Sequence, residues 1–310
     1  MKKVLLYVSI PVFILILLPF ITGNLEKNRL NDEIRKEIGL NFLQLSDGTV
    51  HYHVSGPEDG EVVVLVHGNA APLFSWDKNV KALTDAGFRV IRYDLYGFGF
   101  SDRPDVNYSR EVYDRQLYEL LSELNIDGPV NLAGTSQGGS IAVEFTANHP
   151  EKVKRLALLA PFINILPMKA VIGLVKVPGI GEYMAATAFD RINLNYPEKV
   201  FSDTDSITPE FTERYREQLS YEGFKRARLS NLRGDAISDF TSRYEKVAET
   251  GIPVLLTRGT ADIIIMDDSI ENIKKAIPEI EYHEIKGGGH LVHYENPGSV
   301  NGVLTEFFRK

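Results

Sequence analysis

The chain has 310 residues, of which 44% are hydrophobic and 25% are charged. This length suits one large α/β domain with an insertion, and the composition excludes a wholly disordered, collagen-like or coiled-coil protein. The 34 Lys and Arg against 42 Asp and Glu leave a formal charge of −8, so we expect no nucleic-acid partner. Because the chain contains no cysteine, disulfides, thiolate metal ligands and a Cys nucleophile are excluded. The oligomeric state is left open.

The N-terminus carries an apolar run. Residues 4–21 contain 18 residues without a charge, preceded by Lys2 and Lys3. As a helix this run would be roughly 27 Å long, close to the hydrocarbon thickness of a bilayer. We therefore predict that residues 1–23 form a single-pass membrane anchor. The alternative is a signal peptide whose cleavage releases a secreted or periplasmic protein.

The orientation of this segment is predicted from its flanking charges. The two lysines before the run favour a domain on the extracytoplasmic side, whereas the basic residues within 27–36 favour the opposite orientation. We expect the extracytoplasmic arrangement. Residues 24–39, with charges of both signs, are predicted to be a linker.

From residue 40 short apolar runs alternate with amphipathic stretches. A hairpin is predicted at 41–54 around Ser46-Asp47-Gly48, and the apolar run at 62–66 predicts a buried strand. Further strands are predicted at 89–94, 130–132, 154–159, 253–257 and 281–285, and helices at 76–86, 109–125, 137–148, 269–276 and 299–308. This alternation predicts an α/β fold with a mostly parallel, doubly wound sheet.

The alternation lapses between residues 161 and 243. This span shows helical patterns and no buried strand, so we predict a helical cap inserted over the sheet. The core then comprises residues 40–160 and 244–310. Only three charged residues occur within 162–189, which suggests that the cap lines an acyl pocket or contacts a membrane surface in addition to packing on the core.

The first motif with chemical meaning is Gly134-Thr135-Ser136-Gln137-Gly138-Gly139. It follows an apolar strand and precedes a helix, which is the context of a nucleophile elbow. We expect Ser136 to adopt a strained conformation with its hydroxyl exposed above the strand end. The helix that follows would favour developing negative charge at its N-terminus.

A second turn, Val66-His67-Gly68-Asn69-Ala70, ends the buried strand at 62–66. A loop of small residues there can aim a backbone N–H at the same point as the N–H of Gln137, and two such donors form an oxyanion hole. We expect His67 to be structural and to hold this loop through its ring nitrogens.

Two late loops supply a base and an acid. Asp262 follows the strand at 253–257, and His290 follows Gly287-Gly288-Gly289 after the strand at 281–285. A serine hydroxyl needs a base, and the base needs an acid to orient it. The chain order Ser136, Asp262, His290 is the order found in α/β-hydrolases, so we predict that these three residues are catalytic.

Other histidines and polar residues receive structural interpretations. His293 is the alternative candidate to His290 for the catalytic base. His51 and His53 share one face of a strand, which we expect to face solvent because no third metal ligand accompanies them. Asp94 and Ser101 are expected to brace the loop at 94–102.

These motifs resemble the α/β-hydrolase superfamily, in the branch of serine hydrolases with a helical cap. The matching segments are His67-Gly68-Asn69 and residues 94–102, 134–139, 259–262 and 287–290. The resemblance covers about residues 40–160 and 244–310. It implies an eight-stranded, mostly parallel sheet, a hydrolase without cofactor or metal, and oxyanion donation from the backbones of Asn69 and Gln137.

Departures from related patterns narrow the chemistry that the resemblance implies. Ser136 stands where dehalogenases and epoxide hydrolases have Asp, and Gln137 stands where proline iminopeptidases have Trp. Ala70-Ala71-Pro72 and Leu291 depart from the patterns of meta-cleavage C–C hydrolases. We predict hydrolysis of small-molecule esters, including lipid-like esters such as monoacylglycerols. A C–C hydrolase, an acyltransferase and a non-catalytic membrane-tethered binding module remain alternatives.

Overall fold

The computed structural model describes residues 24–69, 71–164 and 169–310. The predicted anchor at residues 1–23 therefore lies outside the described residues. Within the described ranges, no helix combines the length and the apolar character that crossing a bilayer requires.

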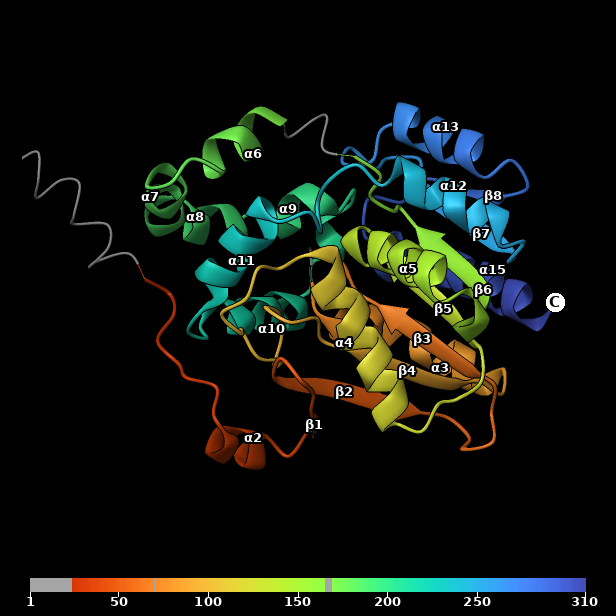
Figure 1. Cartoon of the computed structure of the whole chain (residues 1–310), viewed down its shortest axis with the longest axis horizontal. Helices are drawn as coiled ribbons and strands as arrows, with labels where there is room; N and C mark the ends of the chain where they lie inside the picture. Colours follow the sequence, from red (N-terminus) through yellow and green to blue (C-terminus); the bar gives the residue numbers. More distant parts are fainter. Residues whose placement is uncertain (1–23, 70, 165–168) are drawn as a thin grey trace, which may run out of the picture.

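The core of the molecule is one eight-stranded sheet (Figure 1). Its strands are β1 (Asn41–Gln44), β2 (Thr49–Ser55), β3 (Val62–Val66), β4 (Arg89–Tyr93), β5 (Val130–Thr135), β6 (Val153–Leu159), β7 (Val254–Gly259) and β8 (Glu281–Ile285). The strand order is β1-β2-β4-β3-β5-β6-β7-β8. The β1–β2 and β2–β4 pairs are antiparallel and the other pairs are parallel. The predicted hairpin and the mostly parallel sheet are thus confirmed.

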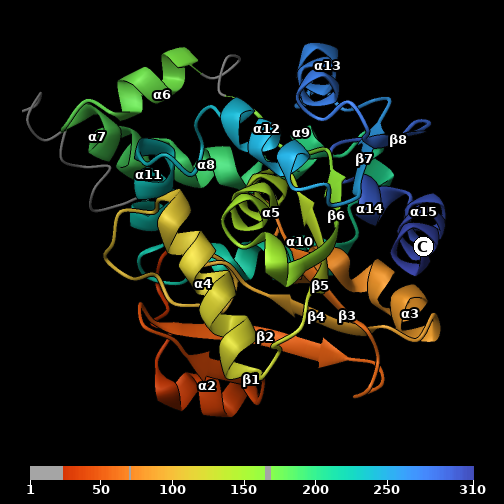
Figure 2. The same ribbon diagram turned by 45° about the vertical axis from the view of Figure 1, so that its right-hand side comes forward.

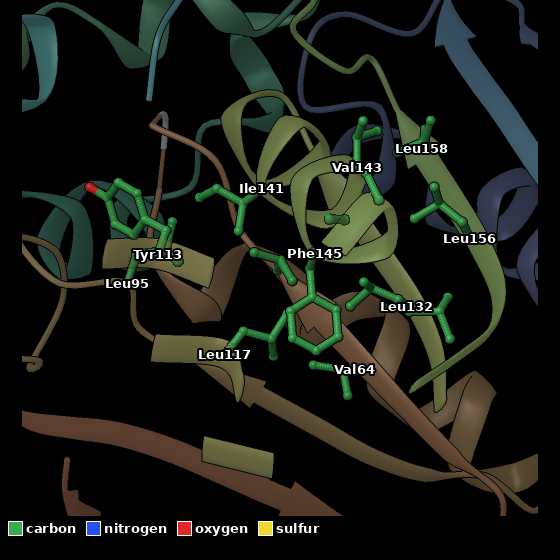
Figure 3. Packing of buried hydrophobic residues seen from close by; sticks show 14 of the residues in the cluster. Val64, Leu95, Tyr113, Leu117, Leu132, Ile141, Val143, Phe145, Leu156 and Leu158 are labelled. Atoms are coloured by element: carbon green, nitrogen blue, oxygen red, sulfur yellow. The ribbon is translucent and has the colours of Figure 1, made fainter. Parts of the chain in front are cut away.

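The apolar character of β3 follows from burial on both faces. Val64 and Val66 pack into one hydrophobic cluster, whereas Val63 and Leu65, which point the opposite way, pack into another. A strand covered on both sides needs no polar face, so its sequence shows a continuous apolar run. Figure 3 shows the first cluster, in which Val64 lies close to Phe145.

Helices cover both faces of the sheet (Figures 1 and 2). The second cluster is closed by α3 (Asp77–Asp85) and α15 (Pro297–Arg309). The first is closed by α4 (Arg110–Glu123), α5 (Gln137–Asn148), α12 (Thr241–Glu249) and α13 (Asp267–Ala276). The short elements beside them are η1 (Leu73–Trp76), η2 (Pro150–Lys152) and α14 (Val292–Glu295).

The inserted segment is helical in its described part. It contains α6 (Lys169–Val175), α7 (Ile180–Thr187), α8 (Phe189–Leu194), α9 (Pro197–Val200), η4 (Thr204–Ser206), α10 (Pro209–Leu219) and α11 (Phe224–Arg233). The predicted boundary at residue 243 falls inside α12, which packs against α5 and α13. Helix α12 therefore belongs with the core layer, because its Tyr244 and Val247 are fully buried there.

Residues 24–39 are packed against the rest of the chain. The N–H groups of Lys27 and Asn28 donate to the carbonyl oxygen of Ser220 at 2.8 and 2.9 Å. Helix α2 (Asp32–Ile38) begins at the capping side chain of Asn31 and contributes the buried Arg35. The linker predicted from mixed charge is thus attached to the cap along part of its length.

The loop after β4 is organised by Asp94, as predicted. One Asp94 carboxylate oxygen accepts from the N–H of Leu73 at 2.9 Å, and the other accepts from the N–H of Phe100 at 2.9 Å. The Ser101 hydroxyl donates to the Asp94 carbonyl oxygen at 2.6 Å. Asp94 therefore ties the segment after β3 to the loop after β4.

The prediction that His51 faces solvent is wrong. His51 is 3% exposed, and its Nδ1 lies 2.6 Å from Asp94 Oδ2. The ring of Phe100, from the loop after β4, lies against it in an edge-on arrangement. Strand periodicity places a residue on a face but does not reveal which distant loop covers that face, so the error follows from a tertiary contact.

Candidate active site

Ser136 lies at a tight turn between β5 and α5. Its φ of +53° and ψ of −123° confirm the strained conformation expected for this turn. Two glycines permit the turn. A Cβ on Gly134 would lie 2.3 Å from the Gly138 carbonyl oxygen, and a Cβ on Gly138 would lie 2.3 Å from the His67 carbonyl oxygen. No other residue type fits at either position without moving backbone.

The structure brings Ser136, His290 and Asp262 into one chain of polar contacts. His290 Nε2 lies 2.9 Å from Ser136 Oγ, and His290 Nδ1 lies 3.0 Å from Asp262 Oδ2. All three residues are at most 7% exposed. In the neutral imidazole Nδ1–H donates to the carboxylate, which leaves Nε2 free to accept from the serine hydroxyl. This is the arrangement that can withdraw a proton from Ser136.

Asp262 is held as a carboxylate. Its Oδ1 accepts from the N–H groups of Ile264 at 2.7 Å and Ile265 at 3.1 Å. Burial alone would raise the pKa of Asp262, but the neighbouring His290 and these two N–H donors outweigh it, so the pKa lies below its usual value. An ionised Asp262 can both orient the His290 ring and stabilise its protonated form.

The loop after β3 lies directly against the serine. A Cβ on Gly68 would come within 2.8 Å of Ser136 Cβ, so this loop borders the hydroxyl. His67 holds it as expected, since its Nδ1 lies 2.8 Å from the Gly68 carbonyl oxygen and its Nε2 accepts from the N–H of Leu95 at 2.9 Å. Burial lowers the pKa of His67, which keeps the ring neutral, as these two bonds require.

Asn69 and Gln137 flank the serine from two loops. Gln137 is the first residue of α5, so its N–H has no partner within the helix. Among the described residues, neither the Asn69 N–H nor the Gln137 N–H donates to a partner. Two such donors, one on the loop that borders Ser136 and one at the start of α5, can bind an oxygen that develops negative charge.

The cap helix α11 contacts both of these residues, which the sequence did not predict. The side-chain amides of Asn231 and Gln137 pair through two hydrogen bonds of 2.9 and 3.0 Å. Asn231 also donates to Asn69 Oδ1 at 3.3 Å, and Arg228 donates to the same oxygen. The i, i+3 spacing places Arg228 and Asn231 on one helix face, but periodicity does not say which core loop that face meets.

The cap contacts His290 as well. The N–H of His290 donates to the carbonyl oxygen of Val200, at the end of α9, at 2.9 Å. The site is therefore built from five segments: the loops after β3, β5, β7 and β8, and the cap. Within the described ranges, no three His, Asp or Glu side chains converge closely enough to hold a metal ion.

The His293 ring makes no hydrogen bond to the described residues. Its ring lies 4.2 Å from the Trp76 ring, measured between centroids, and is fully buried. Both ring nitrogens are buried, and neither has a hydrogen-bond partner among the described residues. Burial, with a smaller contribution from His290, lowers the pKa of His293 to about 3. His290 is the imidazole that contacts Ser136.

The chain is similar to known proteins over most of its length. A family model described as the alpha/beta hydrolase fold matches residues 61–297. An uncharacterized carboxylesterase of Bacillus subtilis is 26% identical, over 86% of this chain and 85% of that protein. A 2-hydroxy-6-oxononadienedioate/2-hydroxy-6-oxononatrienedioate hydrolase of Klebsiella pneumoniae is also 26% identical, over 87% of this chain and 95% of its own. The solved structure of a thermophilic esterase from Thermogutta terrifontis superimposes with a TM-score of 0.74, at 23% identity, over 87% of this chain and 98% of that chain.

The buried His293 predicts a measurable pH dependence of stability. In the unfolded chain the His293 ring takes up a proton as the pH falls below its ordinary pKa of 6.5. In the folded chain the ring stays neutral until about pH 3. The free energy of unfolding therefore falls as the pH is lowered through this window. Between pH 6.5 and pH 4, wild-type protein should lose on the order of 3 kcal/mol more unfolding free energy than His293→Phe. Urea denaturation of both proteins at several pH values measures this difference. Parallel pH curves would show that His293 does not cause it.

Proposed function

The chain belongs to the α/β-hydrolase family, and from that premise we propose that it is a serine hydrolase that cleaves carboxylic esters through an acyl-enzyme on Ser136. The observation that carries this proposal is the pair of contacts at 2.9 and 3.0 Å that join Ser136, His290 and Asp262. The carboxylesterase among the relatives supports the choice of substrate class.

The mechanism is acyl transfer in two steps. Ser136 Oγ attacks the ester carbonyl carbon while His290 Nε2 takes the hydroxyl proton, and Asp262 stabilises the resulting imidazolium. The carbonyl oxygen becomes an oxyanion that accepts from the N–H groups of Asn69 and Gln137. The bond to the alcohol then breaks, and His290 gives its proton to the departing oxygen. Water, deprotonated by His290, attacks the acyl-enzyme and regenerates Ser136.

The preferred acyl group is a fatty acyl chain, as in monoacylglycerols. The apolar composition of the cap supports this choice, because α6 and α7 contain Lys169 and Glu182 as their only charged residues. An apolar wall binds an acyl chain by the hydrophobic effect, with about 0.8 kcal/mol gained per buried CH₂. Short water-soluble esters should therefore be poorer substrates than medium-chain esters.

A C–C bond hydrolase is the second candidate, favoured by the Klebsiella pneumoniae relative that matches most of this chain. It would use the same serine on a vinylogous diketone. Turnover of such a diketone in excess of p-nitrophenyl esters would favour this candidate. Formation of a new ester in the presence of an added alcohol would indicate an acyltransferase.

Replacement of Ser136 tests its role as the nucleophile. Ser136→Ala should abolish labelling by a fluorophosphonate probe and lower kcat on a p-nitrophenyl ester by roughly 10⁴- to 10⁶-fold, because the attacking oxygen is gone. Ser75→Ala is the matched control, since Ser75 is equally buried and its hydroxyl has no partner among the described residues. Wild-type protein that takes no label would favour a non-catalytic, membrane-tethered binding module.

Replacement of Asn231 tests the contact between the cap and Gln137. Asn231→Ala removes the partner of the Gln137 amide and one of the two donors to Asn69 Oδ1, so both residues lose a hydrogen bond. We expect kcat to fall roughly 10- to 100-fold with KM little changed, because a displaced oxyanion donor weakens transition-state binding. Asn193→Ala is the control: its amide is also buried in the cap but donates to Phe189 within α8. An unchanged kcat for Asn231→Ala would contradict this role.

The protein attaches to a membrane through residues 1–23, with the hydrolase domain on the extracytoplasmic side. The 18-residue apolar run at 4–21 supports this proposal. Intact protein recovered from membranes should retain Met1 and resist extraction by alkaline carbonate. Release of a shorter chain that starts near residue 24 would indicate a cleaved signal peptide instead.

A further inference from the structure

The cap exposes several large apolar side chains. Six of the nine large apolar residues that are exposed in the described part of the chain lie on α6, α7 and α8 or between them. These six define the cap apolar surface: Val171, Leu174, Val177, Ile180, Tyr183 and Ile192. Helix α6 packs on α7, and α7 packs on α8. Both views show these helices at the end of the molecule remote from α15 (Figures 1 and 2).

Helix α6 is apolar on both sides. Ile172 and Val175 are buried against the rest of the cap, whereas Val171 and Leu174 are 50% and 52% exposed. A helix that is apolar all round normally has both sides covered by protein or lipid. The outer side of α6 therefore indicates a partner that is itself apolar.

The charges around this surface are positive. Lys169, Lys176 and Arg191 are exposed, and no carboxylate of the described residues lies within ion-pair distance of any of them. The acidic side chains on the same helices are neutralised: Glu182 pairs with Arg233, and Asp190 pairs with Lys225. In a chain of net charge −8, unpaired cations beside apolar side chains are typical of a surface that binds anionic lipid.

The chain enters the described structure beside the same helices. The N–H of Leu25 donates to the Asp190 side chain on α8 at 3.2 Å, and the Glu26 carboxylate accepts from the N–H of Lys225 at 2.6 Å. The apolar run ends at Ile21, three residues before Asn24. Three residues reach at most about 11 Å, so a bilayer that holds the run lies close to α8.

We propose that the cap apolar surface docks on a bilayer that contains anionic lipids, beside the point where the N-terminal run enters it. The proposal rests on the membrane attachment proposed above. Tethering raises the local concentration of the cap at the bilayer, and the apolar side chains and the three cations then supply the second contact. Stable membrane binding commonly requires two such signals. Docking would also place the cap, and the site beneath it, beside lipid-like esters.

The absence of cysteine from the chain allows a site-specific test with the full-length protein. Leu174→Cys and, as control, Tyr118→Cys each receive a polarity-sensitive fluorophore; Tyr118 is 40% exposed on α4 of the core. The vesicles contain phosphatidylcholine with or without phosphatidylglycerol. With phosphatidylglycerol, we expect emission at position 174 to shift to shorter wavelength and to be quenched by spin-labelled acyl chains, while position 118 stays unchanged.

The possible failures are distinguishable. Protein that sediments with vesicles but shows an unshifted probe at 174 overturns the docking proposal alone. Protein that stays in the supernatant with an unshifted probe overturns both docking and attachment. A shift of the emission at position 174 in the absence of vesicles also overturns docking. If that shift depends on protein concentration, a second copy of the chain covers this surface. If it does not, residues 4–21 cover it.

The charges provide a matched second test. Combined Lys169→Gln, Lys176→Gln and Arg191→Gln should lower the ratio of docked to undocked cap, read from the 174 probe, by roughly 100-fold. Combined Lys246→Gln, Lys275→Gln and Lys286→Gln removes three exposed lysines of the core and should leave the ratio unchanged. Equal effects of the two triple variants would refute a specific role for the cap cations.

Discussion

The candidate site depends on the close approach of two backbone segments beneath Ser136. The first turn of α5 lies so near the end of β3 that Gly138 contacts the carbonyl oxygens of Val66 and His67 with no room for a Cβ. This contact accompanies the positive φ of Ser136. It also sets the N–H of Gln137 next to the loop that carries Asn69. A wider separation would move the nucleophile and both candidate oxyanion donors at once.

The cap is part of the site as well as a cover for it. Helix α11 reaches Asn69 and Gln137 through Asn231, and the end of α9 accepts from the N–H of His290. The residue after Ser136 is a Gln because its side-chain amide pairs with the buried amide of Asn231. Neither amide is left without a hydrogen-bond partner. Movement of the cap would therefore change the surroundings of His290, Asn69 and Gln137 together.

Polar and apolar surfaces divide between the two halves of the cap. The end of α9 and helix α11 carry the polar contacts just described. The half formed by α6–α8 carries the cap apolar surface and its unpaired cations. The contacts with Asn69, Gln137 and His290 and the cap apolar surface therefore lie on different helices of one insertion.

The sequence by itself determined the parallel sheet, the nucleophile turn and the three polar residues that meet there. Each leaves a local signature: a continuous apolar run at β3, glycines around Ser136, and polar residues in the loops after β7 and β8. Parallel strands end at one edge of the sheet, so the convergence of Ser136, Asp262 and His290 follows from their positions after strands.

Some contacts between distant segments leave no signature in the local sequence, and only the tertiary structure decided them. The burial of His51 by the loop at 94–102, the pairing of Asn231 with Gln137, and the attachment of residues 24–28 to the cap all join parts far apart in the chain. Side-chain periodicity gives the direction of a residue relative to its own helix or strand. The residue that lies opposite depends on how separate elements pack, which is a property of the whole folded chain.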